Sequence, residues 1–231
     1  QFETGIIDNG KVTTIYDPDE QKTVIAYSDN GNSGYGTAVV GTVTSDTTLS
    51  FGTPVVFESA DIGAVSACYD TAANKTVIVY ADNGNSSYGT GIVGTVSGTS
   101  ISFGTAVVYS SNDSRTSCCI FEPNSGKVVI ASKQYSGLNR GDTHVGTVSG
   151  TSISYGSSDT FLSTIPEYIA MSYDPDNSNQ ILICCRNDSG GAGTAVVAAV
   201  SGTSCSFGTP VVFAATSTYW VQPVYDTVQN K

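Results

Sequence analysis

Apolar residues occur along this chain in short runs that are separated by turn residues. Within residues 62–111, four such runs follow one another, joined by turns rich in Gly, Asn, Asp and Ser. The runs cover 62–70, 75–81, 88–96 and 101–109. Short runs rich in Val, Ile, Thr and Tyr between turns of this kind are typical of an antiparallel β-meander. We therefore predict an all-β fold.

The pattern of four runs returns along the chain at a constant spacing. A Ser-aromatic-Gly motif places four aromatic residues 52 positions apart. They are Phe51, Phe103, Tyr155 and Phe207. A period near 50 with several strands in each copy indicates a blade or array architecture.

The chain holds about four and a half copies of this pattern in its 231 residues. We predict a single domain over 1–231, which is either a fragment of a longer chain or an incomplete ring. In the alternative, a small ring closes because strands near 11–28 pair with strands near 193–213.

The second run of each copy is apolar on both faces, as residues 77–80 illustrate. A sheet with one solvated face would alternate apolar and polar residues, so both faces of this sheet are expected to be covered. We therefore predict a β-propeller, in which four-stranded antiparallel blades stack around an axis and cover one another. The third run, 88–96, is rich in Gly and Thr, and we expect it to lie innermost, where blades converge. A linear array of small β modules is the alternative, although β-sandwiches usually need about 100 residues.

The charge of the chain restricts its partners. Nine Lys and Arg residues stand against twenty Asp and Glu, for a net charge of −11. Nucleic-acid binding needs clustered basic residues, so we expect no nucleic-acid partner. No apolar run approaches the roughly 18 residues of a spanning helix, so we expect no membrane insertion.

Six cysteines and a single histidine offer little for a metal site or a disulfide framework. Two pairs of adjacent cysteines lie inside strand runs, where neighbouring side chains point to opposite faces. The repeat register places Cys184 at the position of Tyr80, and His144 at the position of Ile92. We expect buried, reduced thiols, a buried histidine and no cofactor.

Two loops with the sequence Asp-Asn-Gly-Asn-Ser, at 29–33 and 82–86, are the most distinctive local motifs. The aspartate is expected to accept backbone N–H groups of the turn, and the glycine to supply a positive φ. The loops resemble the Asp-box hairpin of sialidase-type propellers, which implies a structural role away from a catalytic site. A sugar-contacting loop is the second interpretation. A calcium loop is the third, although one carboxylate per loop is few for calcium.

The candidate ligand-binding residues come from these loops and from two aromatic residues that interrupt the repeat. The loop candidates are Asp29, Asn30, Asn32, Tyr35, Asp82, Asn83, Asn85 and Tyr88. Tyr168 and Trp220 occupy one repeat position, where earlier copies carry Lys11 and Ala64. An exposed aromatic ring there could stack on a sugar ring. The alternative is that both rings fill space between blades.

Three arginines, Arg115, Arg140 and Arg186, invite comparison with the carboxylate-binding arginines of sialidases. General acid and base catalysis of glycoside hydrolysis needs paired carboxylates in a cleft. The acidic residues after the repeated aromatic instead recur once per copy, which indicates turn capping. We therefore expect scattered, solvated arginines and no enzyme.

The unit combines Tyr-Asp-x4-Lys with Val-Gly-Thr-Val-Ser-Gly-Thr-Ser-Ile-Ser-Phe-Gly. It resembles repeat units of propeller proteins on viral and bacterial surfaces, including phage tail-fibre-like proteins and small lectin propellers of the tachylectin type. The resemblance implies multivalent binding of a glycan or cell-surface ligand, with avidity from similar sites. A self-assembling building block of an appendage, fibre or surface layer is the alternative, and an Asp-box glycosidase is third. Each implies an extracellular location, secreted or on a virion or cell surface.

Overall fold

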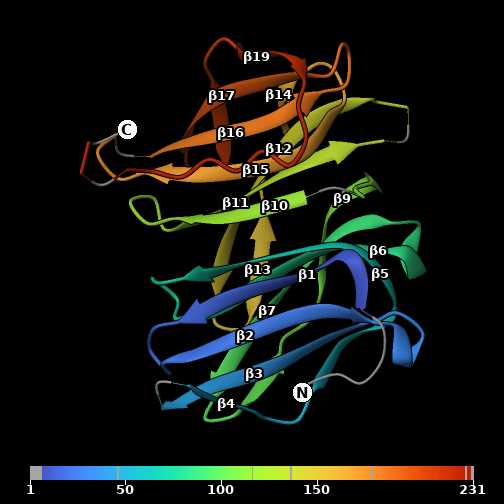
Figure 1. Cartoon of the computed structure of the whole chain (residues 1–231), viewed down its shortest axis with the longest axis vertical. Coiled ribbons are helices and arrows are strands. Elements are labelled where there is room, and N and C mark those ends of the chain that lie inside the picture. Colours follow the sequence, from blue (N-terminus) through green and yellow to red (C-terminus); the bar gives the residue numbers. More distant parts are fainter. Residues whose placement is uncertain are drawn as a thin grey trace.

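The computed structural model describes residues 7–45, 47–115, 117–135, 137–177, 179–226 and 228–229, with side chains from residue 11 onward. Strands dominate this part of the chain, and its only helical elements are the 3-10 turns η1 (Asn30–Asn32) and η2 (Asn83–Asn85). The strands form three antiparallel sheets of nine, five and five strands. These sheets stack along the long axis of the molecule, from the blue N-terminal part to the red C-terminal part (Figure 1). The predicted all-β class is confirmed.

The strands follow one arrangement four times, and we call each occurrence a unit. Unit 1 contains β1 (Ile7–Asp17), β2 (Lys22–Asp29), β3 (Tyr35–Ser45), β4 (Thr48–Phe51) and residues 55–61 of β5 (Val55–Asp70). Unit 2 contains residues 62–70 of β5, β6 (Lys75–Asp82), β7 (Tyr88–Ser97), β8 (Ser100–Phe103) and β9 (Val107–Asp113). Unit 3 contains β10 (Ser117–Glu122), β11 (Lys127–Gln134), β12 (Arg140–Ser149), β13 (Ser152–Tyr155) and β14 (Asp159–Leu162). Unit 4 contains β15 (Pro166–Asp174), β16 (Gln180–Asn187), β17 (Ala192–Ser201), β18 (Ser204–Phe207) and β19 (Val211–Ser217).

The predicted fourth strand, 101–109, is two strands in the structure. β8 and β9 both pair with β7, on either side of the break at Gly104. The amide of Gly104 donates to the carbonyl of Val93 at 2.9 Å. A Cβ atom at Gly104 would lie only 1.9 Å from the carbonyl oxygen of Thr151, so the next unit packs against a position that only glycine can occupy. This contact explains the glycine of the repeated Ser-aromatic-Gly motif.

The third strand of each unit was expected to lie innermost, where the units converge. This expectation is wrong. β7 has β6 on one side and β8 with β9 on the other, so it lies inside its sheet. The first strands approach one another instead, because β5 lies against β1 and β10, and β10 lies against β15. The small residues of the third strand make room for an aromatic ring of the fourth. A Cβ atom at Gly89 would lie 2.4 Å from the ring of Tyr109, and one at Gly141 would lie 2.4 Å from the ring of Phe161.

The alternative of a small closed ring is wrong for the described residues. β1 pairs with β2, and β19 pairs with β17, so no ladder joins 11–28 to 193–213. The chain after β19 instead repeats the end of a first strand. Asp226 accepts the amides of Val228 and Gln229, as Asp17 accepts the amides of Asp19 and Glu20.

Apolar layers between successive units form the core. In β6 all residues from Thr76 to Ala81 are buried, so both faces of this strand are covered as predicted. The layer between units 1 and 2 includes Val40, Phe57 and Tyr80. Complete burial of such side chains stabilises the fold by roughly 1.5–3 kcal/mol each.

The two ends of the stack leave apolar side chains uncovered. Phe213 of β19 is 53% exposed, whereas the equivalent Phe57, Tyr109 and Phe161 are 9%, 7% and 3% exposed. The difference arises because a following unit covers the other three rings.

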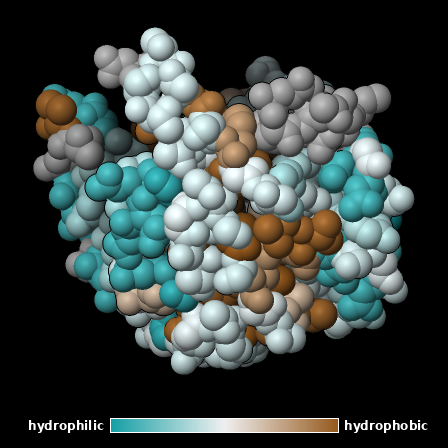
Figure 2. Space-filling view, turned by 90° about the horizontal axis from the view of Figure 1, so that it is seen from below, coloured by the Kyte–Doolittle hydropathy of each residue, from teal (hydrophilic) through white to brown (hydrophobic). Residues whose placement is uncertain are grey.

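The opposite end shows the same contrast on the other face of its sheet. Val43 and Leu49 are 69% and 51% exposed, whereas their equivalents in unit 2, Val96 and Ile101, are 6% and 3% exposed. Apolar surface is gathered over this end of the molecule in the view from below (Figure 2). No helix of the described residues is long and apolar enough to cross a membrane.

Candidate functional site

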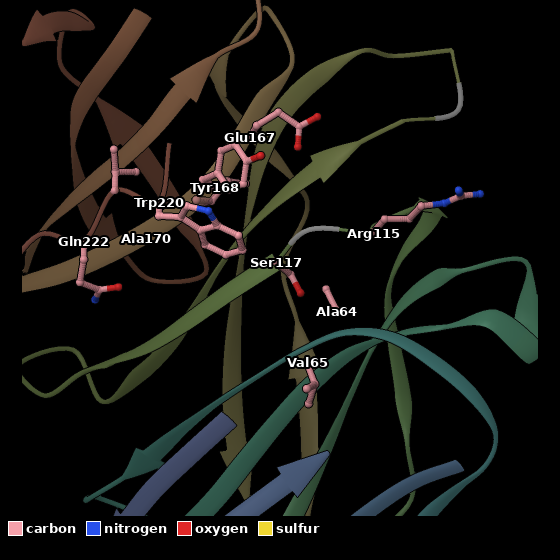
Figure 3. A pocket seen from close by; sticks show the side chains of 11 residues that line it. Ala64, Val65, Arg115, Ser117, Glu167, Tyr168, Ala170, Trp220 and Gln222 are labelled. Carbon is pink, nitrogen blue, oxygen red and sulfur yellow. The ribbon is translucent and has the colours of Figure 1, made fainter. Parts of the chain in front are cut away.

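A cavity of about 440 Å³ opens where the first strands of units 2, 3 and 4 meet the segment after β19 (Figure 3). Its lining includes Arg115, Ser117, Glu167, Tyr168, Trp220 and Gln222. The two aromatic residues that interrupt the repeat are therefore brought together. Ala64, at the equivalent repeat position of unit 2, lines the same cavity.

Tyr168 and Trp220 form an aromatic pair at this cavity. Their ring centroids are 5.0 Å apart and the planes are inclined by 50°. The side chain of Trp220 is 73% exposed. Tyr219 meets Tyr168 edge-on, with centroids 5.7 Å apart. An indole ring that is held at one edge and open to solvent over its face can accept the apolar face of a ligand.

A β-bulge accounts for the direction of the Tyr168 side chain. Glu167 pairs with Arg186 and Ala170 pairs with Cys184, so three steps on β15 oppose two on β16. Bulges re-aim side chains at functional sites. Tyr168 has a φ of 53° and Trp220 a φ of 55°, in the left-handed region that is costly for bulky residues. Such strain, about 1–3 kcal/mol for each residue, persists only where the surrounding contacts maintain it.

Arg186 packs against the two tyrosines beside the cavity, Tyr168 and Tyr219. Its guanidinium carbon lies 5.4 Å from the ring centroid of Tyr168 and 5.0 Å from that of Tyr219. The guanidinium also bonds to Asp188 at 2.5 Å. Cation–π contacts of this kind add roughly 0.5–2 kcal/mol and fix the ring positions.

Cations around the cavity are paired with carboxylates. Arg115 Nε lies 2.8 Å from a carboxylate oxygen of Asp113. Lys133 pairs with Glu167. In Figure 3 the guanidinium of Arg115 and the carboxylate of Glu167 both point away from Trp220. The charged groups of the lining therefore do not face the indole.

The eight hairpin candidates lie outside the lining of this cavity. Asp29 accepts the amide of Asn32 at 3.1 Å. Asp82 accepts the amide of Asn85 at the same distance, 3.1 Å. Asn83 donates to Asp61 at 2.5 Å and accepts from Ser87 at 2.9 Å. The bonds of Asp29 and Asp82 close the turns, and the bond from Asn83 to Asp61 joins the second loop to β5.

The remaining hairpin candidates belong to the same two loops. Asn30 is exposed in η1, and the half-buried Tyr35 and Tyr88 open β3 and β7. Tyr35 pairs across the sheet with Asp29, and Tyr88 pairs with Asp82.

The expected positive φ of the hairpin glycine is wrong. Ser33 and Ser86 take the left-handed conformation, with φ values of 60° and 57°. Gly84 lies within η2 and is required for a different reason. A Cβ atom there would lie 2.5 Å from the Cβ of Ala60 in the crossing β5 strand.

The three arginines do not converge. Arg115 lines the cavity and Arg186 packs behind Tyr168. Arg140 pairs with Asp142 at 2.9 Å and is absent from the cavity lining. Their arrangement therefore provides no shared carboxylate-binding centre.

The six cysteines are free, and five of them are buried. Burial raises the pKa of Cys118 and of Cys185 to about 12, which makes these thiols poor nucleophiles. The position of Tyr80 is taken by Cys185 and not by Cys184, because the turn before β16 holds one extra residue. No group of three potential metal ligands among His, Cys, Asp and Glu occurs in the described residues.

Three polar residues of the cavity, Ser117, Glu167 and Gln222, were not among the sequence candidates. Arg115 was considered only as one of the three arginines that were expected to be solvated. A detectable signal lies one position before Tyr168 in the repeat, where Gly63 of unit 2 is replaced by Arg115, Glu167 and Tyr219. Two adjacent repeat positions depart from the common pattern only in the later copies, which marks this strand entrance.

A scan against models of protein families finds no match, and a search of curated proteins finds none either. Solved structures do resemble the chain. The BP39L lectin from Burkholderia pseudomallei aligns with a TM-score of 0.61 and 13% identity over 90% of this chain and 58% of the lectin. An exo-β-1,3-galactanase from Phanerochaete chrysosporium with β-1,3-galactotriose aligns with a TM-score of 0.59 and 8% identity over 94% of this chain and 54% of the enzyme.

A Hadza microbial sialidase, Hz136, aligns with a TM-score of 0.50 and 9% identity over 80% of this chain and 43% of the sialidase. At identities this low, the structural alignments show a shared all-β fold and no more than that. The chain spans about half the length of the structures that it matches.

Proposed function

We propose that the chain is a carbohydrate-binding, lectin-like module and that the Tyr168–Trp220 cavity holds the sugar. The observation that carries this proposal is the exposed indole of Trp220, which stands over a cavity of about 440 Å³. Sugar rings present an apolar face of C–H groups to an aromatic ring and their hydroxyl groups to polar neighbours. Gln222, which is exposed, supplies such a neighbour within the lining.

The four units are proposed to be blades of a β-propeller. Adjacent first strands and apolar layers between neighbouring sheets support this arrangement. The fold is shared with a lectin and with an enzyme whose structure holds β-1,3-galactotriose. A glycan on a cell or virion surface is the proposed ligand, which implies an extracellular setting.

Multivalent binding requires several similar sites on one chain or on an assembly of chains. Unit 2 carries Ala64 where unit 4 carries Tyr168, so the aromatic pair is not reproduced in unit 2. Multivalent binding stays a prediction that requires further sites or several chains acting together.

A structural role is the second candidate, and the uncovered end residues favour it. Phe213 and Leu49 lie at opposite ends of the stack and are 53% and 51% exposed. Surfaces of this kind suit a building block that meets further units. Regular assemblies in a native preparation would support this role.

A glycosidase is the third candidate and has the least support. Glycoside hydrolysis usually requires two carboxylates on either side of the sugar, whereas Glu167 is the one carboxylate in the lining. Glu167 is also held by Lys133.

The proposed site is tested by Trp220→Ala. We expect a loss of sugar affinity of at least about tenfold, because one aromatic contact contributes roughly 0.5–1.5 kcal/mol beyond the area that it buries. The melting temperature should stay nearly constant, since the side chain is 73% exposed. A glycan array followed by isothermal titration with the best ligand measures the affinity, and thermal unfolding measures the melting temperature.

Tyr16→Ala is the matched control, because Tyr16 is also exposed, at 55%, and lies outside the cavity lining. Equal affinities of Trp220→Ala and the unmodified chain would reject the site. A blank array would reject the function.

A further inference from the structure

We infer that the Tyr168–Trp220 cavity selects uncharged sugar residues and rejects sugars that carry a carboxylate. This inference rests on the proposed carbohydrate-binding function. A cavity with arginine and glutamate in its lining could bind either a neutral or an acidic sugar, and the inference chooses the neutral one.

The first argument is that the cations are internally neutralised. Arg115 is paired with Asp113, which is buried with 10% of its side chain exposed. Lys133 is paired with Glu167, and Arg186 with Asp188. A guanidinium whose charge is balanced by a buried carboxylate offers a ligand carboxylate little net attraction.

The second argument is the direction of the charged groups. The guanidinium of Arg115 extends away from the indole of Trp220, and the carboxylate of Glu167 extends away from it as well (Figure 3). Arg186 packs against the rings of Tyr168 and Tyr219 and is absent from the cavity lining. Neither charged group of the lining would therefore face a sugar that is stacked on Trp220.

The third argument is the charge of the whole chain. With nine basic and twenty acidic residues, the net charge is −11. A surplus of negative charge lowers the local concentration of anionic ligands and slows their association, and salt screens this effect. The paired charges at the cavity and the negative charge of the whole chain therefore both disfavour a sugar that carries a carboxylate.

The test uses matched sugars that differ only at C6. Methyl galactoside is compared with methyl galacturonide, and methyl glucoside with methyl glucuronide, by titration into the full chain at pH 7. We expect the neutral member of the binding pair to have at least about tenfold higher affinity, with a smaller ratio at high salt. Equal or tighter binding of the uronide would overturn the inference and leave the proposed function intact. Failure of all four sugars and of a glycan array would reject the function, and the inference with it.

Asp113→Asn tests the role of the charge pair. The substitution keeps the shape and frees the guanidinium of Arg115, so the uronide should gain about three- to tenfold in affinity relative to the neutral sugar. Asp142→Asn is the control, because it breaks the equivalent pair with Arg140 outside the cavity lining and should leave the ratio unchanged.

If Asp113→Asn does not fold, as judged by circular dichroism, Asp188→Asn replaces it. Asp188 is more exposed, at 43% of its side chain, and its substitution frees Arg186. An unchanged ratio in the folded variant would show that the pairs do not set the selectivity.

Discussion

His144 shows how one substitution within the repeat creates a pH-dependent position. Units 1, 2 and 4 carry Val39, Ile92 and Val196 at the equivalent place. His144 is buried against the ring of Tyr109, with centroids 5.0 Å apart. Neither ring nitrogen has a hydrogen-bond partner among the described residues. Burial lowers the pKa of His144 from 6.5 to about 4, against the opposing effect of nearby Asp142.

This pKa predicts a specific loss of stability in acid. The unfolded chain takes up a proton near pH 6.5 and the folded chain only near pH 4, so the stability due to the neutral histidine falls as the pH drops between these values. The loss amounts to about 3 kcal/mol over the full window. We expect His144→Val to remove this part of the pH dependence, as measured by denaturant unfolding at pH 7 and pH 4.5. Parallel pH profiles of the two proteins would contradict a buried neutral histidine.

The reason for the hairpin glycine can be tested by a double substitution. Gly84→Val should destabilise the chain by about 1–3 kcal/mol, because the new side chain meets Ala60. Asn83→Ala should cost about 1 kcal/mol or less, since its bonds are exposed. Ala60→Gly should restore stability to Gly84→Ala if the contact is the cause. Thermal unfolding of the four variants decides, and absence of any rescue would point back to backbone dihedrals.

Two residues of the proposed site stood out in the sequence. Tyr168 and Trp220 depart from the repeat, and the structure brings them together. Ser117 and Gln222 gave no signal, because a serine in a chain rich in serine and a glutamine near its end have no pattern to break. Their place at the cavity depends on how the units meet, which is a tertiary property.

At the scale of elements, the alternation of apolar runs and turns predicted the first three strands of a unit, whereas the predicted fourth strand is two strands in the structure. The place of the third strand was predicted wrongly because its glycines were attributed to crowding between blades. They accommodate rings of the fourth strand, as Gly89 does for Tyr109. The long strand β5 was also not foreseen, since its two halves pair with different units and no turn residue separates them.

Two equivalent aromatic residues should differ in their contribution to stability. Phe161 is 3% exposed and packs between units 3 and 4, whereas Phe213 is 53% exposed at the open end. We expect Phe161→Ala to reduce the free energy of unfolding by about 3–5 kcal/mol. Phe213→Ala should cost less than half as much. Chemical denaturation of both variants measures the difference, and similar losses would mean that Phe213 is covered in solution.

At the scale of the whole molecule, periodicity predicted repeated sheets with both faces covered. Closure could not be predicted, because the pairing partners of the first and last strands are not encoded in a local pattern. The site lies where repeats meet, at the entrance of β15. The sequence pattern within one repeat therefore predicts the fold more readily than it predicts a cavity that residues of three repeats line together.

The unlike ends of the stack restrict how copies could associate. The last sheet exposes the face that holds Phe213, and in the other units this face packs against the next unit. The first sheet exposes the face that holds Val43 and Leu49, and in the other units this face packs against the preceding unit. Contact between these surfaces is heterologous, so it orders every copy in the same direction. Such an association could propagate as a filament or close by rotation, whereas a two-fold pair would leave one kind of end unmatched.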